Sequence, residues 1–267
     1  MPPGRGGRRG IPPQKNHDVF LSAEDLNRAY GVDPLIAKAY VDRRVPPGNA
    51  YWKGRLLYMP PVPGYIFMPI FSDLCLRCGI PREALLSEEC LSLAEAVLDS
   101  AARLEEGVFD GPSHVRNCLG KAEGSSNNPS FLKDLRLCLG VGEGVPSIQI
   151  GTPFPSLNRA DTYLLSLAGI PFGADTGRKV AAAWTALMSY LLVQDDLLDL
   201  KEDLERGQEN AFIDAGLDAE GMERVVSLVD AGLSLLSEVN PTLGARFMEK
   251  RRALDVAAIL DPYMRRG

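Results

Sequence analysis

The feature that most constrains this chain is the stretch DTGRKVAAAWTALMSYLLVQDDLLDLKEDLERG at residues 175–207. Its central part, AAAWTALMSYLLVQ at residues 181–194, is apolar on nearly every side of a helix, which predicts a buried, central helix. Its second half holds six carboxylates between Asp195 and Glu205. Asp175 is a suitable N-cap and Gly207 a suitable C-terminal stop. The fold must therefore surround this helix with apolar partners and also accommodate concentrated negative charge at its end.

The other segments show helical periodicity and no strand alternation. Two short amphipathic helices are expected around Gly31 and Pro34, and a long proline-rich loop over residues 46–64. Further helices are expected over residues 65–79, 82–107, 158–169, 219–239 and 245–266. Residues 110–155 are rich in Gly, Ser, Asn and Pro and form the least ordered-looking interior segment, with one short helix at SFLKDLRLCLG. We predict an all-α, single-domain helical bundle over residues 18–267.

Composition excludes several classes of protein. The 267 residues are 45% hydrophobic and 24% charged with a net charge of −6, so the chain lacks the basic balance of a nucleic-acid binder. No apolar run reaches the roughly 18 to 20 residues of a membrane span, and MPPGRGGRRGIPPQKN has no apolar region of a signal peptide. We expect a cytoplasmic protein with reduced cysteines and a disordered basic tail over residues 1–17.

The acidic helix end predicts a cation site. Asp195, Asp199 and Asp203 stand four residues apart and share a helix face, where like charges repel and the helix dipole disfavours them. Only Lys201 and Arg206 are nearby in sequence to offset six negative charges. A solvated acidic helix end is the simpler interpretation. Because the preceding segment is expected to be buried, however, the carboxylates would emerge inside the bundle, where Mg²⁺ is the cation that suits them.

The motif QDDLLD after an apolar helix resembles the second aspartate-rich motif of trans-prenyl diphosphate synthases, in the class I isoprenoid synthase superfamily. DLERGQENAFI is similar to the segment that follows that motif, and DLKEDLERGQ also resembles the second motif of squalene and phytoene synthases. The resemblance spans residues 60–265. It implies a helical bundle of the isoprenoid synthase type with a central apolar cavity, in which Mg²⁺ holds a prenyl diphosphate.

Upstream, residues 68–111 resemble the run that leads to the first aspartate-rich motif of these synthases. On this reading Glu105, Glu106 and Asp110 stand where the first aspartates would be. A charged helix end capped by Gly107 is an equally good interpretation.

The resemblance implies roles for individual residues. Asp195, Asp196 and Asp199 would be catalytic, because Mg²⁺ held there stabilises the diphosphate as it leaves. Apolar and aromatic walls would shield the resulting cation from water. The metal set would be Asp195, Asp196, Asp199, Asp203, Glu105, Glu106 and Asp110. The substrate set would be Arg178, Lys179, Lys201, Arg206, Gln194, Trp184, Phe67 and Phe71, with Met188 and Tyr190 as further wall candidates and Arg159, Lys250, Arg251 and Arg252 as further cations.

Two departures from the family argue against chain elongation. PGYIFMP at residues 63–69 lacks the Lys and Arg of the motif that binds isopentenyl diphosphate, and Gln208 and Asn210 replace a lysine and a threonine of the family. A second anionic substrate would therefore lack its clamp. His114 is expected in a polar loop without a catalytic partner.

Three functions remain open from the sequence. The first is a Mg²⁺-dependent enzyme that ionises an allylic prenyl diphosphate, similar to a terpene synthase. The second is a chain-elongating prenyltransferase, and the third is a catalytically silent prenyl synthase-like subunit with a binding or regulatory role. The resemblance implies either a homodimer or association with a prenyl synthase.

Overall fold

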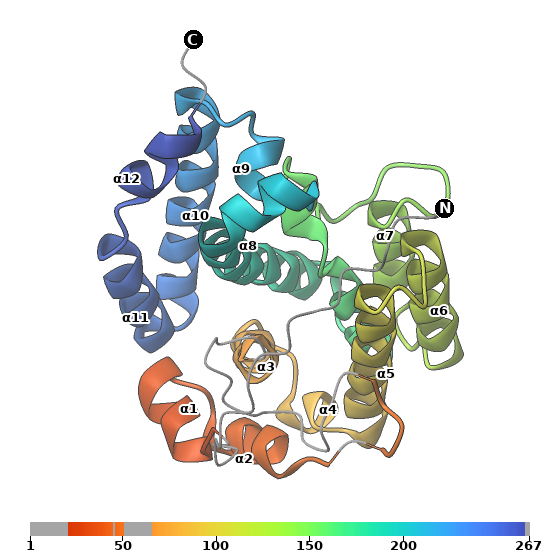
Figure 1. The fold of residues 1–267 in the computed structure, drawn as a ribbon. Coiled ribbons are helices and arrows are strands. Elements are labelled where there is room, and N and C mark those ends of the chain that lie inside the picture. The colour runs from red at the N-terminus through yellow and green to blue at the C-terminus, as the bar shows by residue number, and fades with distance from the viewer. Residues whose placement is uncertain (1–20, 45, 51–65, 265–267) are drawn as a thin grey trace.

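A computed structural model of the chain describes residues 21–44, 46–50 and 66–264. Within these ranges the protein consists of helices and has no β-strand, which confirms the all-α prediction (Figure 1). The predicted basic tail, residues 1–17, and most of the predicted proline-rich loop lie outside the described residues.

The long helix predicted from the sequence is α8, Ala174–Arg206, which runs through the middle of the molecule (Figure 1). It packs against α3 (Phe67–Arg77) and α10 (Ala219–Val239), so its apolar first half is buried as expected. Gly207 ends it with a left-handed φ of 64°, a conformation that glycine adopts without steric cost. The N-cap prediction was wrong: Gly173 is the N-cap, and Asp175 lies in the first turn.

The other elements surround α8. The two predicted short helices are confirmed, with Ser22 and Asp33 accepting hydrogen bonds at their N-termini. The predicted helix over residues 82–107 is divided in two, because Ser87 caps a new helix, α5. The bounds are α1 Ala23–Tyr30, α2 Pro34–Asp42, α4 Arg82–Leu85, α5 Glu88–Glu105, α9 Ala211–Asp214, α11 Pro241–Arg252 and α12 Val256–Leu260.

Residues 111–138 are more ordered than the sequence predicted. They form α6, Gly111–Gly124, and α7, Pro129–Cys138. Polar residues that suggested a loop are caps: Asp110 accepts from the Ser113 amide and Asn128 from the Phe131 amide, with a proline in the first two positions of each helix. The short helix predicted at SFLKDLRLCLG is therefore confirmed as α7, whereas the expectation of a poorly ordered segment was wrong for residues 111–124, which form α6.

Two 3₁₀ helices, η1 (Pro155–Asn158) and η2 (Asp161–Leu167), lie between the α5–α7 side of the molecule and α8. An α-helix was predicted for residues 158–169, whereas the observed segment is 3₁₀ and every residue of η2 is buried. A third 3₁₀ turn, η3 (Asp261–Tyr263), follows α12. The half-buried connection between η1 and η2 carries Arg159, and η2 carries Thr162; both residues line a cavity together with residues of α5 and α8.

The two ends of the described chain are joined by a buried polar contact. The Asn240 side chain, 1% exposed, donates to the Tyr30 carbonyl at 3.0 Å and to Asp73 Oδ2 at 2.9 Å. Buried apolar side chains from Leu26 to Leu260 form one continuous cluster. Among the described residues, no helix is both long enough and apolar enough to cross a bilayer.

Candidate functional site

A cavity of about 540 Å³, which we call the main cavity, lies between α3, α5, α6, η2 and α8. Its volume falls within the range of small-molecule sites. Most of its wall is apolar: Phe67, Val97, Leu98, Ala101, Leu104, Ala160, Tyr163, Met188, Leu191, Leu192 and Leu198. The structure thus places an apolar cavity beside the acidic half of α8.

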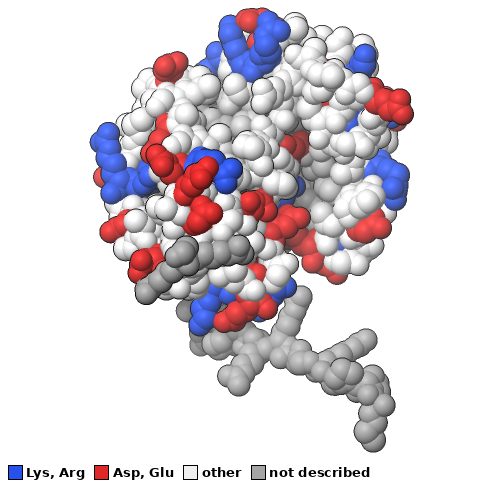
Figure 2. All heavy atoms as spheres, turned by 90° about the horizontal axis from the view of Figure 1, so that it is seen from above, with Lys and Arg blue, Asp and Glu red and all other residues white. Residues whose placement is uncertain are grey.

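The cavity opens at a charged rim, which we call the mouth: Glu105, Arg159, Gln194, Asp195 and Glu209. The three carboxylates belong to exposed residues, and the Asp195 side chain is 54% exposed. Arg159 reaches the mouth from the η1–η2 connection and donates to Asp195 Oδ2 at 3.4 Å. One face of the molecule shows acidic side chains around a hollow with few basic groups among them (Figure 2).

Asp195 and Asp196 have different surroundings although they are adjacent. Asp196 is 2% exposed, accepts from Arg159 at 2.8 Å and accepts from the Ala211 amide at 2.7 Å. Burial raises the pKa of both carboxyls, Arg159 opposes this rise, and Asp199 and Asp203 add to it for Asp195. Asp196 is committed to internal contacts, whereas Asp195 borders the cavity and, among the residues that the structure describes, has the longer contact to Arg159 alone.

Asp203 also has an internal role. It is 8% exposed and accepts from the Asn210 side chain at 2.8 Å, while the same amide group donates to the Asp196 carbonyl at 2.7 Å. These contacts fix the segment after Gly207 against α8. Asp199 is exposed one turn beyond Asp195 and does not line the main cavity.

Of the three upstream acids, only Glu105 lines the main cavity. Although the residue as a whole is exposed, partial desolvation of its carboxyl raises its pKa, and the adjacent Glu106 raises it further. Glu106 is the exposed C-cap of α5. Asp110 caps α6 by accepting from the Ser113 amide at 2.7 Å, an interaction that lowers its pKa. One carboxylate from α5 and one from α8 therefore border the same cavity.

The basic candidates are dispersed, and among them only Arg159 lines the main cavity. Arg178 and Lys179 pair with Asp175 near the start of α8, and Arg178 precedes Asp195 by 17 residues, about 25 Å along the helix. Exposed i,i+4 ion pairs occupy the remaining two cations of α8, Lys201 with Glu205 and Arg206 with Glu202. Lys250, Arg251 and Arg252 are on α11, where Arg251 pairs with Asp230 at 3.1 Å.

Some of the aromatic candidates line the main cavity, and the others are buried in the hydrophobic core. Phe67 and the apolar Met188 line the main cavity, whereas Phe71, Trp184 and Tyr190 are buried in the core. The Trp184 indole stacks with Tyr163 at 5.6 Å and donates to Asp161 Oδ1 at 2.7 Å. Burial raises the pKa of Asp161 to about 6. Trp184 supports the wall without forming it.

Three polar residues of the cavity were missed at the sequence level: His114, Thr162 and Glu209. The expectation that His114 lies in a polar loop was wrong, because it is a buried residue of α6, 4% exposed. Its position could have been predicted: Asp110 followed by Gly-Pro is a helix-start signal, and Cys118 repeats at i+4 on the same face.

The residues at the mouth offer fewer carboxylates for a magnesium ion than the sequence predicted. No group of three His, Cys, Asp or Glu side chains that could hold a metal occurs within the described ranges. Mg²⁺ in substrate complexes commonly uses one or two protein carboxylates together with phosphate and water oxygens. Asp195 can supply one such carboxylate; Glu105 lines the same cavity and Asp199 follows one turn along α8, whereas Asp196 and Asp203 are engaged in contacts with Arg159 and Asn210.

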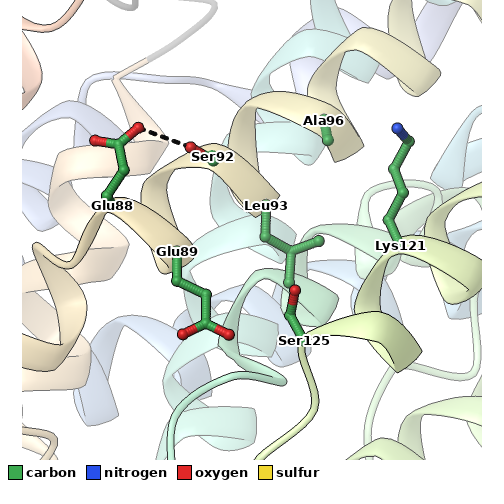
Figure 3. A pocket seen from close by; sticks show the side chains of 7 residues that line it. All are labelled: Glu88, Glu89, Ser92, Leu93, Ala96, Lys121 and Ser125. Atoms are coloured by element: carbon green, nitrogen blue, oxygen red, sulfur yellow. Dashed lines mark hydrogen bonds between the residues drawn. The ribbon is translucent and has the colours of Figure 1, made fainter.

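A second, shallower hollow of about 330 Å³ lies between α5 and α6 (Figure 3). It is lined by Glu88, Glu89, Ser92, Leu93, Ala96, Lys121 and Ser125. Its Glu88 carboxylate already accepts from Ser92 at 2.8 Å and from the Arg43 guanidinium at 2.5 Å. The main cavity, with its deeper apolar wall, is the better candidate for a ligand site.

Comparisons with protein-family models, with curated proteins and with solved structures found no match. Membership of the isoprenoid synthase superfamily stays a prediction from the sequence motifs.

Proposed function

We propose that this protein binds a prenyl diphosphate, with the isoprenoid chain in the main cavity and the diphosphate at the mouth, and promotes loss of the diphosphate as a terpene synthase does. The observation that carries the proposal is that Glu105 of α5 and Asp195 of α8 border one apolar cavity. Two acidic helix ends around an apolar cavity suit a ligand with a long apolar chain and a head group bound through a cation.

Different residues of the cavity would bind the isoprenoid chain, the diphosphate and the metal ion. The apolar wall would surround the chain and exclude water from an allylic cation. Arg159 would contribute a guanidinium to a diphosphate oxygen in exchange for its 3.4 Å contact with Asp195. Asp195, with Glu105 or Asp199, would hold Mg²⁺, which supplies positive charge to the departing diphosphate when bound.

The mouth favours one diphosphate over two. Arg159 is the cationic side chain among the described residues that line the main cavity. A chain-elongating prenyltransferase must bind a second anionic substrate, which would need its own basic clamp. We therefore favour ionisation of a single prenyl diphosphate over elongation.

The test is incubation with geranyl, farnesyl and geranylgeranyl diphosphate, with and without Mg²⁺, followed by pyrophosphate and product analysis. We expect release that requires Mg²⁺ and falls at least 100-fold on Asp195→Asn combined with Asp199→Asn. Asp175→Asn, an exposed carboxylate on the same helix, is the matched control. Mg²⁺-dependent release that survives the double substitution would contradict the metal assignment.

A second candidate function is a catalytically silent binding or regulatory subunit. It is favoured by the engagement of Asp196 and Asp203 in contacts with Arg159 and Asn210, which leaves fewer carboxylates for metal than an aspartate-rich motif provides. On this reading the protein binds a prenyl diphosphate without turnover and co-purifies with an active prenyl synthase. Turnover by the isolated chain would exclude it.

A further inference from the structure

A buried hydrogen-bonded chain of side chains interrupts the apolar wall of the main cavity. His114 Nδ1 lies 2.9 Å from Ser100 Oγ, and His114 Nε2 lies 3.1 Å from Thr162 Oγ1. His114 and Thr162 both line the cavity and are 4% and 6% exposed. The pair joins α6 to η2 and, apart from the mouth residues, lines the cavity together with apolar residues such as Val97 and Leu98.

Thr162 has hydrogen-bonding capacity beyond its contact with His114. A threonine hydroxyl offers one donor and two acceptor positions. If it donates to Nε2, its lone pairs remain; if it accepts from an Nε2–H group, its own hydrogen remains. In either tautomer of the imidazole, a ligand atom in the cavity finds a hydrogen-bonding partner at Thr162.

The pair is suited to an uncharged group. Burial lowers the pKa of His114, so the imidazole is neutral near pH 7. A neutral imidazole and a hydroxyl cannot compensate the cost of burying a full charge. They can, however, hydrogen-bond a hydroxyl or carbonyl oxygen, and such polar groups orient ligands in apolar pockets.

The pair is also separated from the charged mouth. Ser100, which contacts His114, precedes Glu105 by five residues on α5, a distance of about 7 to 8 Å along the helix. A ligand could therefore place one group at the mouth and a second, neutral group at His114 and Thr162.

We propose that His114 and Thr162 form a binding site for a neutral oxygen, so that the main cavity accepts oxygenated isoprenoids, alcohols or carbonyl compounds, in preference to the corresponding hydrocarbons. The inference rests on the proposed function in one respect, that an isoprenoid chain occupies this cavity. It requires neither Mg²⁺ nor a diphosphate.

The test compares farnesol, farnesal and farnesene, which share a chain and differ in oxygen. Dissociation constants are measured without Mg²⁺ by displacement of an apolar fluorescent dye. We expect the wild-type protein to bind farnesol and farnesal roughly tenfold more tightly than farnesene. Thr162→Val should reduce this ratio to about twofold or less, and Thr162→Ser should preserve it.

The ratio within each variant separates oxygen recognition from general damage to the cavity. Thr176→Val, at the distant start of α8, is the matched control, and circular dichroism checks the fold of each variant. If Thr162→Val does not fold, the conservative His114→Gln tests the same prediction. Three results would overturn the proposal. The wild type could prefer farnesol over farnesene by less than twofold, the affinity ratio could be unchanged by substitution of Thr162 and His114, or it could change on Gln194→Leu instead.

Failure of the proposed function is distinguishable from failure of this inference. A protein that releases no pyrophosphate but shows a Thr162-dependent preference for farnesol retains the oxygen site and loses the catalytic proposal. A protein that turns over prenyl diphosphates without such a preference supports the catalytic proposal and contradicts the oxygen site.

Discussion

Arg159 carries the positive charge that compensates a buried carboxylate at the mouth of the main cavity. Its guanidinium lies 2.8 Å from Asp196, which is 2% exposed, and 3.4 Å from Asp195. Removing one partner of a buried ion pair leaves the other charge desolvated and uncompensated. The stability of this part of the molecule should therefore depend on Arg159.

Arg159→Gln should lower the free energy of unfolding by about 2 to 3 kcal/mol, somewhat less than for a fully buried pair, because the Arg159 side chain is 27% exposed. Urea denaturation measures the change. Arg206→Gln, which breaks an exposed pair with Glu202, should change it by about 0.5 kcal/mol or less. Equal effects of the two substitutions would show that the Asp196 contact is not a buried ion pair.

Asp161 should make stability depend on pH. Its carboxyl is buried against Trp184, and burial raises its pKa from 3.8 to about 6. Because the folded pKa is above the unfolded one, the folded state binds the proton more tightly. The stabilising contribution is present below about pH 4 and is lost as the pH rises through 6.

Asp161→Asn removes this titration. The difference in unfolding free energy between wild type and variant should shift by about 2 kcal/mol between pH 4.5 and 7.5, with the wild type losing stability relative to the variant as pH rises. Urea titrations at several pH values measure it. A difference that stays constant over this range would contradict the assigned shift.

The sequence predicted four equivalent aspartates on α8, yet the structure separates them. Asp196 and Asp203 are seven residues apart, on the face that also carries the buried Leu200 and Val193, so both turn inward to Arg159 and Asn210. Asp195 and Asp199 lie outside that face. Carboxylate spacing alone predicted a shared site, whereas the apolar residues interleaved with it determine which carboxylates remain available.

At the scale of elements, two helical glycines should respond to alanine with opposite sign. A Cβ on Gly244 of α11 would lie 2.4 Å from the Ser237 Cα of α10, backbone that cannot move aside without separating the helices. A Cβ on Gly120 of α6 would meet no atom within 4 Å. Alanine otherwise favours a helix over glycine by roughly 0.5 to 1 kcal/mol.

Gly244→Ala should therefore destabilise the protein by about 2 kcal/mol or more, and Gly120→Ala should stabilise it by about 0.5 to 1 kcal/mol. Thermal or urea unfolding of the two variants measures both. Stabilisation by Gly244→Ala would mean that α10 and α11 are not packed as closely as the structure has them.

The elements were predicted with uneven success for a physical reason. The helix α8 was predicted correctly because its segment before the aspartates is apolar on most sides, a pattern typical of a buried helix. Its predicted end at Gly207 was also correct. The helix α6 was missed because its start, at Asp110, is made of the same residue types that form loops, whereas α7 had been predicted at SFLKDLRLCLG. The same residue types occur at helix N-caps and in loops. A cap can be distinguished from a loop only by the apolar helix face that follows it.

At the scale of the whole molecule, the helices surround an apolar cavity whose mouth is supplied by α5, the η1–η2 connection, α8 and the segment between α8 and α9. An apolar cavity borders Gln194, Asp195 and Leu198 of the QDDLLD stretch, whereas the central cavity of an isoprenoid synthase stays a prediction. Its polar interior pair, His114 and Thr162, comes from segments 48 residues apart. Such a juxtaposition depends on tertiary packing that no local pattern specifies.

The claim shared by the catalytic and silent functions is that this cavity holds an isoprenoid chain, and saturation binding of farnesyl diphosphate with Mg²⁺ tests it most directly. Ala101 of α5 lines the cavity, so Ala101→Trp should fill part of it and weaken binding at least tenfold. Ala182→Trp, at an exposed position of α8, should leave binding unchanged. Equal affinities for wild type and Ala101→Trp, or no binding by the wild type, would contradict the account.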